Sequence, residues 1–163
     1  MTKNLVLRGL QVGDIGWVAH RQGILYAQEY GWDGSFEAMV AQIAAHYVQN
    51  LDPAKENAWI AECEGRVVGS VFVVKVSDTE AKLRLLYVEP EMRGTGLGRR
   101  LTRECIAFAK DRGFHQLSLW TNDNLHAAKH IYQTAGFKLL SQETHHSFGH
   151  DLVGQHWALD LKN

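Results

Sequence analysis

The stretch Tyr87–Leu101 reads YVEPEMRGTGLGRRL and joins an apolar, strand-like run to an amphipathic helix. The run KLRLLYV (82–88) predicts a strand that stops before Pro90. Apolar residues at helical spacing predict a helix over residues 95–112. The first amides of a helix have no partner within it, so the loop 93–98 offers free donors beside the positive end of the helix dipole. The sequence therefore predicts an anion site in this loop.

Two features of this loop favour phosphate as the anion. Glycines alternate with other residues over positions 94–98, so few side chains hold a phosphate away from the backbone. Arg93, Arg99 and Arg100 add positive charge. The simpler alternative is a tight turn between a strand and a helix, with the arginines exposed to solvent.

Three kinds of phosphate-binding loop can be compared with this one. The nucleoside triphosphate loop GxxxxGK[ST] is excluded, because the chain contains no Gly-Lys-Ser or Gly-Lys-Thr. The dinucleotide fingerprint GxGxxG is excluded because it would need glycine where Arg99 stands. The acetyl-CoA pyrophosphate loop, [QR]xxGx[GA], fits in full with Arg93, Gly96 and Gly98. The loop therefore favours acetyl-CoA as the ligand.

The rest of the chain predicts further strands and helices around this unit. Ser35 is expected to cap the second helix, and Phe36 and Met39 are expected in the core. The predicted order β-α-α-β-β-β-α-β-α-β-β is typical of an α/β (α+β) fold with a largely antiparallel sheet covered by helices. A right-handed crossover over 82–121 would place two strands parallel. Strands are predicted at 5–10, 58–63, 66–76, 82–88, 116–121, 137–143 and 156–161, and helices at 13–30, 35–50, 95–112 and 124–135.

Two stretches resemble the GCN5-related N-acetyltransferase (GNAT) superfamily. YVEPEMRGTGLGRRL is similar to its signature strand, loop and helix, and NLHAAKHIYQTAGFKLL is similar to its next helix, including Tyr132, Gly136 and Phe137. More narrowly, HRQGILYAQEYGWDGSFEAMV and HHSFGHDLVGQHW resemble the acetyltransferase half of bacterial proteins that often carry an N-terminal MarR-type regulator. The resemblance implies the GNAT fold, with a splayed parallel strand pair in a mostly antiparallel sheet, over one domain at residues 1–163.

The resemblance also implies acetyl-CoA as the cosubstrate. The backbone of residues 86–88 would bind the pantetheine arm and polarise the thioester carbonyl. Tyr132 would protonate the leaving thiolate as a general acid, whereas the alternative for this residue is a packed aromatic side chain. The implied cofactor-binding residues are Leu86, Tyr87, Val88, Arg93, Gly94, Thr95, Gly96, Leu97, Gly98, Arg99 and Asn124.

The acceptor side departs from the family at one position. Many relatives carry a carboxylate on the cofactor-binding strand where this chain has Lys82. Lys82 and Arg84 share one strand face; they either bind an acidic group of the substrate or form a solvated face, and the second reading is favoured for Arg84. A substitute base would come from loop 29–33 or from the C-terminal histidines. The residues expected near the acceptor are Tyr30, Trp32, Asp33, Lys82, His145 and His146.

Composition limits the partners. A net charge of −1 gives no electrostatic reason to expect nucleic acid or an anionic membrane. No apolar run approaches the ~20 residues of a membrane span. The histidines near the C-terminus have no acidic or cysteine partner at metal-ligand spacing apart from Asp151, so no metal is expected. Cys63 and Cys105 lie far apart and are expected to be buried, inert thiols of a cytoplasmic protein.

These features predict an N-acetyltransferase that moves the acetyl group of acetyl-CoA to a primary amine by direct attack in a ternary complex. The acceptor is a small-molecule amine, such as an amino-acid-like compound, or a protein amine, and the protein is a monomer or a homodimer. The alternative is an acetyl-CoA-binding regulatory or sensing module with little catalysis, which Lys82 at the carboxylate position favours. Turnover that depends on Tyr132 would separate the two hypotheses.

Overall fold

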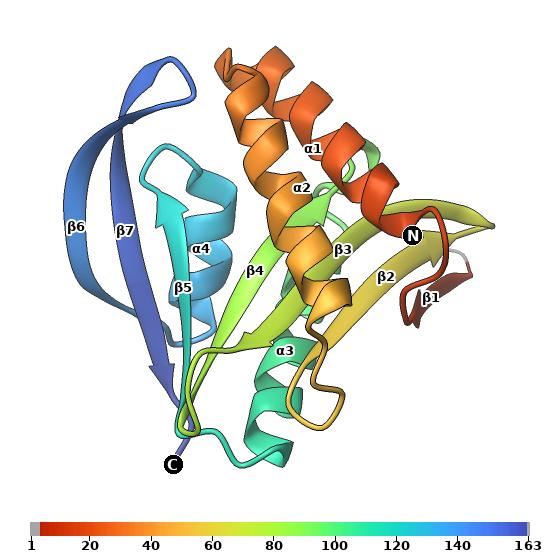
Figure 1. Ribbon diagram of the computed structural model, residues 1–163, viewed down its shortest axis with the longest axis vertical. Helices are drawn as coiled ribbons and strands as arrows, with labels where there is room; N and C mark the ends of the chain where they lie inside the picture. The colour runs from red at the N-terminus through yellow and green to blue at the C-terminus, as the bar shows by residue number, and fades with distance from the viewer. Residues whose placement is uncertain (1–3, 163) are drawn as a thin grey trace.

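The protein folds as a seven-stranded sheet with two helices on each face, seen in a computed structural model that describes residues 4–162 (Figure 1). The strands are β1 (Leu5–Arg8), β2 (Asn57–Cys63), β3 (Arg66–Lys75), β4 (Glu80–Val88), β5 (Gln116–Asn122), β6 (Lys138–Ser147) and β7 (His150–Asp160). The helices are α1 (Asp14–Tyr30), α2 (Gly34–Gln49), α3 (Leu97–Asp111) and α4 (His126–Thr134), with a short 3-10 helix, η1 (Pro90–Met92), before α3.

The strand order in the sheet is β1-β2-β3-β4-β5-β7-β6. Every neighbouring pair is antiparallel except β4 and β5, which are parallel and joined by α3. The predicted fold class and the predicted crossover are therefore confirmed. The parallel pairing begins at Glu80 and Gln116 and ends at Lys82 and Ser118, and beyond this point the two strands diverge (Figure 1).

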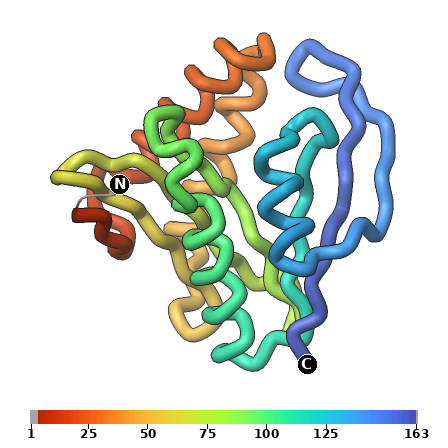
Figure 2. The backbone as a smooth tube through the Cα atoms, turned by 180° about the vertical axis from the view of Figure 1, so that it is seen from behind, coloured from red at the N-terminus to blue at the C-terminus, as the bar shows by residue number. Residues whose placement is uncertain are grey.

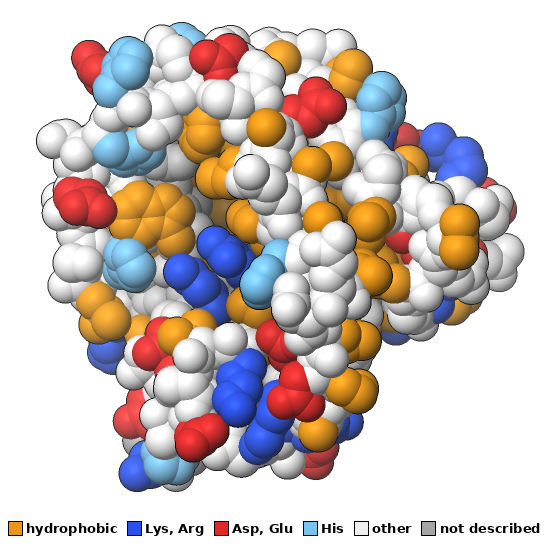
Figure 3. Space-filling view, viewed as in Figure 1, with side chains coloured by type: hydrophobic (Ala, Val, Ile, Leu, Met, Phe, Trp, Pro, Cys, Tyr) orange, Lys and Arg blue, Asp and Glu red, His pale blue; other side chains and the backbone are white. Residues whose placement is uncertain are grey.

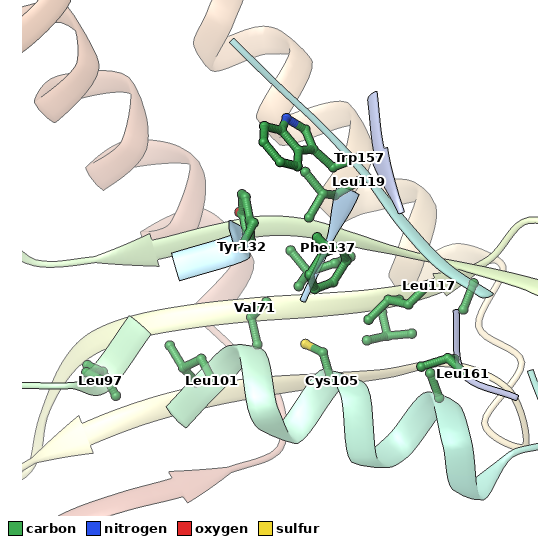
Figure 4. Packing of buried hydrophobic residues seen from close by; sticks show 14 of the residues in the cluster. Val71, Leu97, Leu101, Cys105, Leu117, Leu119, Tyr132, Phe137, Trp157 and Leu161 are labelled. Carbon is green, nitrogen blue, oxygen red and sulfur yellow. The ribbon is translucent and has the colours of Figure 1, made fainter. Parts of the chain in front are cut away.

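Each face of the sheet has its own hydrophobic core. Helices α1 and α2 cover one face, and α3 and α4 cover the other, as the view from behind shows (Figure 2). In α3 the buried residues Leu97, Leu101, Cys105 and Ala109 recur every four residues, so they form one stripe against the sheet. Figure 4 shows part of this stripe with Tyr132, which comes from α4. This core fixes α3 and α4 beside β4.

Two helix starts differ from the prediction. Helix α3 begins at Leu97 rather than at residue 95, because Gly94 and Gly96 have φ angles of +77° and +87° that a helix cannot contain. Asp33, rather than Ser35, caps α2: its carboxylate accepts a hydrogen bond from the Ser35 amide at 3.0 Å. Both residue types are good caps, so the pattern alone did not separate them.

Two other expectations differ from the structure. Strands were predicted only at 137–143 and 156–161, but β6 and β7 extend through residues 144–155 to a tight turn at Phe148 and Gly149, which have φ angles of +58° and +84°. Strand β6 is a mostly exposed edge strand, so its sequence carries no apolar alternation. Met39, expected in the core, is 37% exposed and lines a cavity. Among residues 4–162, no helix is both long and apolar enough to span a membrane.

Candidate active site

Two adjacent cavities occupy the region where β4 and β5 diverge. The larger, about 770 Å³, lies between α1, β4, the loop 93–98 and α4. The smaller, about 330 Å³, lies between α2, β4, β5 and the end of β6 and forms the hollow of Figure 3. The residues that line both cavities are Tyr26, Leu86, Leu125 and Ala128. The two cavities are therefore neighbours that share part of their lining.

The backbone of β4 has an open edge within the larger cavity. A register shift between β3 and β4 falls beside Leu85, whose φ angle is +55°, and this irregularity bends the strand. Because pairing with β5 ends at Lys82, residues 86–88 reach the cavity without a strand partner on that side among the described residues. Those of their amides and carbonyls that do not pair with β3 can bond a ligand as another strand would.

The loop 93–98 supplies donors to the same cavity. The first hydrogen bond of α3 runs from the amide of Arg100 to the carbonyl of Gly96, 3.0 Å away. The amides of residues 97–99 therefore have no partner within the helix, and they lie at its positive end. All residues from 93 to 99 line the cavity. Unpaired amides at the start of a helix are the kind of donors that bind anions, and the anion site itself stays a prediction.

The three glycines of the loop meet different physical demands. Gly94 and Gly96 have positive φ angles, and a Cβ atom built on either would meet nothing within 4 Å. A Cβ on Gly98 would lie 2.7 Å from the Cδ1 atom of Ile131 in α4. Gly98 therefore packs closely against the end of the Ile131 side chain, which would have to move for a larger residue, whereas Gly94 and Gly96 are needed for the turn of the backbone.

Charged groups surround the mouth of the larger cavity. The Arg93 guanidinium donates a hydrogen bond to the Glu29 carboxylate at 2.8 Å, and this bond raises the pKa of Arg93. Arg99 reaches the hydroxyl of Thr134 at 3.3 Å. Glu29 and Tyr30 both line this cavity rather than the smaller one. Tyr30 therefore lies on the side of the predicted cofactor and not, as expected, on the side of the acceptor.

Strand β4 is anchored below the cavity by a buried network. The Tyr87 hydroxyl donates to the Glu89 carboxylate at 2.6 Å, and Arg21 of α1 donates two hydrogen bonds to it at 2.9 and 3.0 Å. Burial alone would raise the pKa of Glu89, but the bonds from Arg21 and Tyr87 outweigh it and hold the pKa below its usual value. The side chain of Tyr87 thus ties the strand to α1.

Tyr132 of α4 lies in the core and lines the smaller cavity. It is 5% exposed and packs against Phe137. Its hydroxyl has no hydrogen-bond partner among residues 4–162, and burial raises its pKa. The hydroxyl therefore stays protonated at neutral pH and has a proton to donate.

Tyr26 of α1 is a residue that the sequence did not single out. It is the only tyrosine among the described residues that lines both cavities, and burial raises its pKa as well. Its ring stacks on Phe36 at 4.9 Å. An aromatic residue in the apolar stripe of a helix looks the same in the sequence whether it fills the core or lines a cavity. No sequence signal therefore distinguished Tyr26.

The smaller cavity is positively charged. Lys82 and Arg84 of β4 line it, and none of its described lining residues is Asp or Glu. Figure 3 shows basic side chains within the hollow beside α2. Burial lowers the pKa of Arg84, and burial together with Arg84 lowers the pKa of Lys82. Arg84 is therefore half-buried in the cavity, which corrects the favoured reading of a solvated strand face.

Only two of the other residues expected near the acceptor line the smaller cavity. Trp32 and His145 line the smaller cavity, and the His145 ring nitrogens are 2.9 Å from Asn122 and from Ser147. Asp33 caps α2, and neither it nor His146 is among the described residues that line the two cavities. The ring of His146 instead pairs with an exposed aspartate, Asp151, at 2.8 Å.

Asn124 and Trp120 also differ from the expectation based on the sequence. Asn124, expected at the cofactor, is not among the described lining residues; its neighbour Leu125 lines both cavities. Trp120 of β5 was missed and lines the smaller cavity. Its ring lies over Gly154 of β7, where a Cβ atom would be only 1.9 Å away. Within residues 4–162, no group of three or more His, Cys, Asp or Glu residues could hold a metal ion.

Comparison with known proteins assigns the family. Residues 24–137, more than half of the chain, match the sequence profile of the acetyltransferase (GNAT) family. The chain belongs to this family. The matched region contains both the loop 93–98 and Tyr132, so the GNAT match covers much of the two cavities. The narrower resemblance to MarR-linked proteins stays a prediction.

Curated relatives of this GNAT protein include human N-acetyltransferase 8B, which is 37% identical over 93 residues, covering 54% of the chain and 41% of the relative. Rat N-acetyltransferase family 8 member 2 is 32% identical over 117 residues, covering 69% of the chain and 48% of the relative. The chain thus spans about half the length of the curated relatives it matches.

Solved structures share the whole fold of this GNAT protein. An N-acetyltransferase from Staphylococcus aureus Mu50 matches with a TM-score of 0.82 and 18% identity, over 98% of this chain and 100% of that one. The Salmonella typhimurium protein yncA, solved with its cofactor acetyl-CoA, matches with a TM-score of 0.79 and 18% identity, over 98% and 95% of the two chains. At 18% identity, the similarity to these two structures shows a shared fold and nothing more.

Proposed function

We propose that the protein is an N-acetyltransferase that transfers the acetyl group of acetyl-CoA to a primary amine of a small molecule, by direct attack in a ternary complex. One observation carries the proposal. The free amides at the start of α3 and the open edge of β4 face one cleft, and a second cavity lies beside it and shares four of its lining residues. We propose that the two cavities hold two ligands in contact. We also propose that residues 1–163 form one domain.

The residues of the larger cavity fit acetyl-CoA. The amides of residues 97–99, together with Arg93 and Arg99, would hold the pyrophosphate. The backbone of residues 86–88 would pair with the amide groups of the pantetheine arm. When bound, acetyl-CoA supplies an activated acetyl thioester. The family match and the relatives named as N-acetyltransferases support this assignment.

Tyr132 is proposed to act as the general acid. Its hydroxyl is protonated and has no hydrogen-bond partner among residues 4–162, and its side chain lines the smaller cavity, so we propose that it donates a proton to the departing thiolate sulfur. An amide of residues 86–88 would donate a hydrogen bond to the thioester carbonyl oxygen, where negative charge develops. Both groups are fixed by the core before a substrate arrives, so little reorganisation is required.

The attacking amine must lose a proton to react. An alkyl ammonium with a pKa near ~10 is mostly charged at neutral pH. None of the described residues lining the smaller cavity is a carboxylate, so we propose that the proton leaves through water, past His145 or the mouth of the cavity. Because the smaller cavity is only about 330 Å³, a small-molecule acceptor fits it better than a protein surface does.

The test combines binding and turnover. Titration calorimetry measures the binding of CoA, which we place in the larger cavity. Release of free thiol from acetyl-CoA, followed across a panel of amines, measures acetyl transfer. Tyr132→Phe should lower kcat by about 100-fold or more and leave the CoA dissociation constant nearly unchanged. The matched control is Tyr47→Phe, which removes a buried hydroxyl that lines neither described cavity.

The outcomes separate the two functional hypotheses. CoA binding with turnover that depends on Tyr132 supports the transferase. CoA binding without turnover on any amine supports the sensing module instead. Absence of CoA binding by the wild-type protein would overturn both, because both place CoA in the larger cavity.

A further inference from the structure

We propose that the acceptor is an amino acid, a primary amine that also carries a carboxylate, and that Lys82 and Arg84 in the smaller cavity bind this carboxylate. The inference rests on the proposed transferase function and adds the substrate class to it. It begins from two cations that lie in one cavity with no carboxylate among the described lining residues.

Neither cation is neutralised by the protein. No described residue forms an ion pair or a hydrogen bond with the side chain of Lys82 or Arg84. Glu80, on the same face of β4, attracts Lys82 electrostatically, but its carboxylate accepts a hydrogen bond from the Ser118 hydroxyl at 2.6 Å. By contrast, Arg8 and Arg21, at structural positions, are each paired with a carboxylate.

Two unpaired, half-buried cations destabilise the empty site. Burial removes water from both side chains, and their like charges repel. A bound anion reverses both effects, because it replaces the lost water and neutralises the repulsion. The arrangement is therefore favourable only with an anionic ligand, which a simple alkylamine is not.

A third polar group in the same cavity also lacks a partner. Gln22 of α1 lines the smaller cavity and is 3% exposed, and its Nε2 atom has no hydrogen-bond partner among the described residues. A buried amide donor without a partner costs free energy unless a ligand satisfies it. A carboxylate has enough lone pairs to accept from Gln22 as well as from a cation. This donor is independent of the two charges and indicates the same kind of ligand.

The walls of the cavity suit the rest of an amino acid. Trp120, Met39 and Ile43 line it beside the charged floor. Met39 is a partly exposed apolar side chain there, which an apolar substrate side chain would cover. We therefore expect aromatic and long aliphatic amino acids to be better acceptors than acidic ones.

The order of residues along β4 is compatible with an α-amino acid. Arg84 lines the smaller cavity two residues before Leu86, which lines both cavities, and the bend at Leu85 lies between them. A carboxylate at Arg84 would thus belong to a ligand whose amine approaches the backbone near Leu86. The two cations also disfavour the protonated ammonium and lower its pKa. Binding of the carboxylate would thus help to supply the neutral amine in a cavity without a carboxylate base.

The experiment compares matched acceptors at saturating acetyl-CoA. Each amino acid is paired with the amine that lacks its carboxylate: phenylalanine with 2-phenylethylamine, and leucine with 3-methylbutylamine. Phenylalaninamide keeps the shape but removes the charge. We expect kcat/KM to be about tenfold or more higher for the amino acid of each pair, and the amide to resemble the amine.

Variants then assign the preference to the two cations. Arg84→Gln and Lys82→Gln should each raise the KM for phenylalanine by about tenfold or more, with a much smaller effect on 2-phenylethylamine. Lys138→Gln is the matched control, because it removes one positive charge from exposed β6 outside both described cavities. All variants should bind CoA as the wild-type protein does.

Several results would overturn the inference. Equal rates for amino acids and their matched amines would do so while leaving the transferase function intact. The same holds if the two variants affect both acceptors alike, or if a protein that binds CoA acetylates none of the amino acids. Failure of the wild-type protein to bind CoA would remove the proposed function itself and this inference with it.

Discussion

Among single residues, Glu29 and Arg93 control the charge at the mouth of the larger cavity. The guanidinium that would meet a phosphate is bonded at 2.8 Å to the Glu29 carboxylate from α1. A phosphate ligand must therefore compete with Glu29, and the carboxylate also repels the ligand directly. The pair is partly exposed, so its contribution is modest.

The first prediction follows from this competition. Glu29→Gln should increase the affinity for CoA by about two- to fivefold, because Arg93 becomes free and a negative charge is lost. Arg93→Gln should decrease the affinity. Titration calorimetry at two salt concentrations measures both effects, which should be smaller at high salt. An unchanged affinity in both variants would show that Arg93 does not contact the ligand.

The second prediction concerns the backbone of the loop. Gly96→Val should weaken CoA binding by about tenfold or more, because Gly96 has a φ angle of +87° and a branched side chain there distorts the loop. The matched control is Gly113→Val at the other end of α3, where the φ angle is +83° and the strain is similar. If both variants lose CoA binding equally, general destabilisation and not the phosphate site explains the loss.

Among elements, β4 and η1 depend on the network around Glu89. Its carboxylate accepts from Tyr87 of β4 and from Arg21 of α1, so it fixes the strand, the following turn and the helix together. Because the folded-state pKa of Glu89 lies below its usual value, the group stabilises the fold above its unfolded-state pKa, near ~4.3. This contribution is lost as the pH falls through the folded-state pKa.

The third prediction uses this dependence on pH. Arg21→Gln should lower the free energy of unfolding by about 1–3 kcal/mol at pH 7, since Glu89 is left charged and poorly paired. The difference from the wild-type protein should shrink as the pH falls through the folded-state pKa of Glu89 and the carboxyl becomes neutral. Urea unfolding from pH 7 to pH 3 measures it. In a Glu89→Gln background, Arg21→Gln should have little effect, and a full effect there would contradict this account.

The elements themselves were predictable to different degrees. The unit from β4 through α3 to β5 followed from its strand run, glycine loop and apolar stripe, because these patterns are local. The extent of β6 and β7 was not predictable: their pairing brings together residues such as Gln142 and Gln155, which neither form an apolar pattern nor lie close in sequence. The bend at Leu85 was not predictable either, because no glycine or proline lies at this position.

The candidate site, like the fold, was predictable from the sequence only in part. On its cofactor side, residues 86–99 form one continuous stretch with a recognisable pattern, but the contributions of Tyr26 and Glu29 from α1 were not predictable. Its acceptor side combines residues from α1, α2, β4, β5 and β6, and only the three-dimensional structure shows that Gln22, Arg84 and Trp120 share a cavity. Charge and aromatic character were visible in the sequence, but their convergence was not.

On the scale of the whole molecule, the sheet is two halves joined by a short parallel pairing. Strands β1 to β4 form one half and β5 to β7 the other, and the pairing of β4 with β5 spans only residues 80–82 and 116–118. A ligand in the larger cavity would contact β4 of the first half and α4, which follows β5 of the second half. Its binding should therefore be visible in the stability of the entire fold.

The fourth prediction measures this bridging. CoA at 100 times its dissociation constant should add about 2.7 kcal/mol to the free energy of unfolding. Hydrogen exchange should slow most for amides of residues 83–88 that do not pair with β3, while amides of β2, far from the cleft, follow only the global change. Equal protection of both strands would mean that the ligand does not bond β4.

The divergence of β4 and β5 also has a consequence for the behaviour of the protein in a crowded solution. An open strand edge is a template for self-association, and here such an edge lies in the middle of a sheet. The bend at Leu85 and the walls formed by α1 and α4 restrict the approach of a foreign strand, although a slender, extended molecule can still enter. The same shape that admits a narrow ligand thus protects the protein against aggregation.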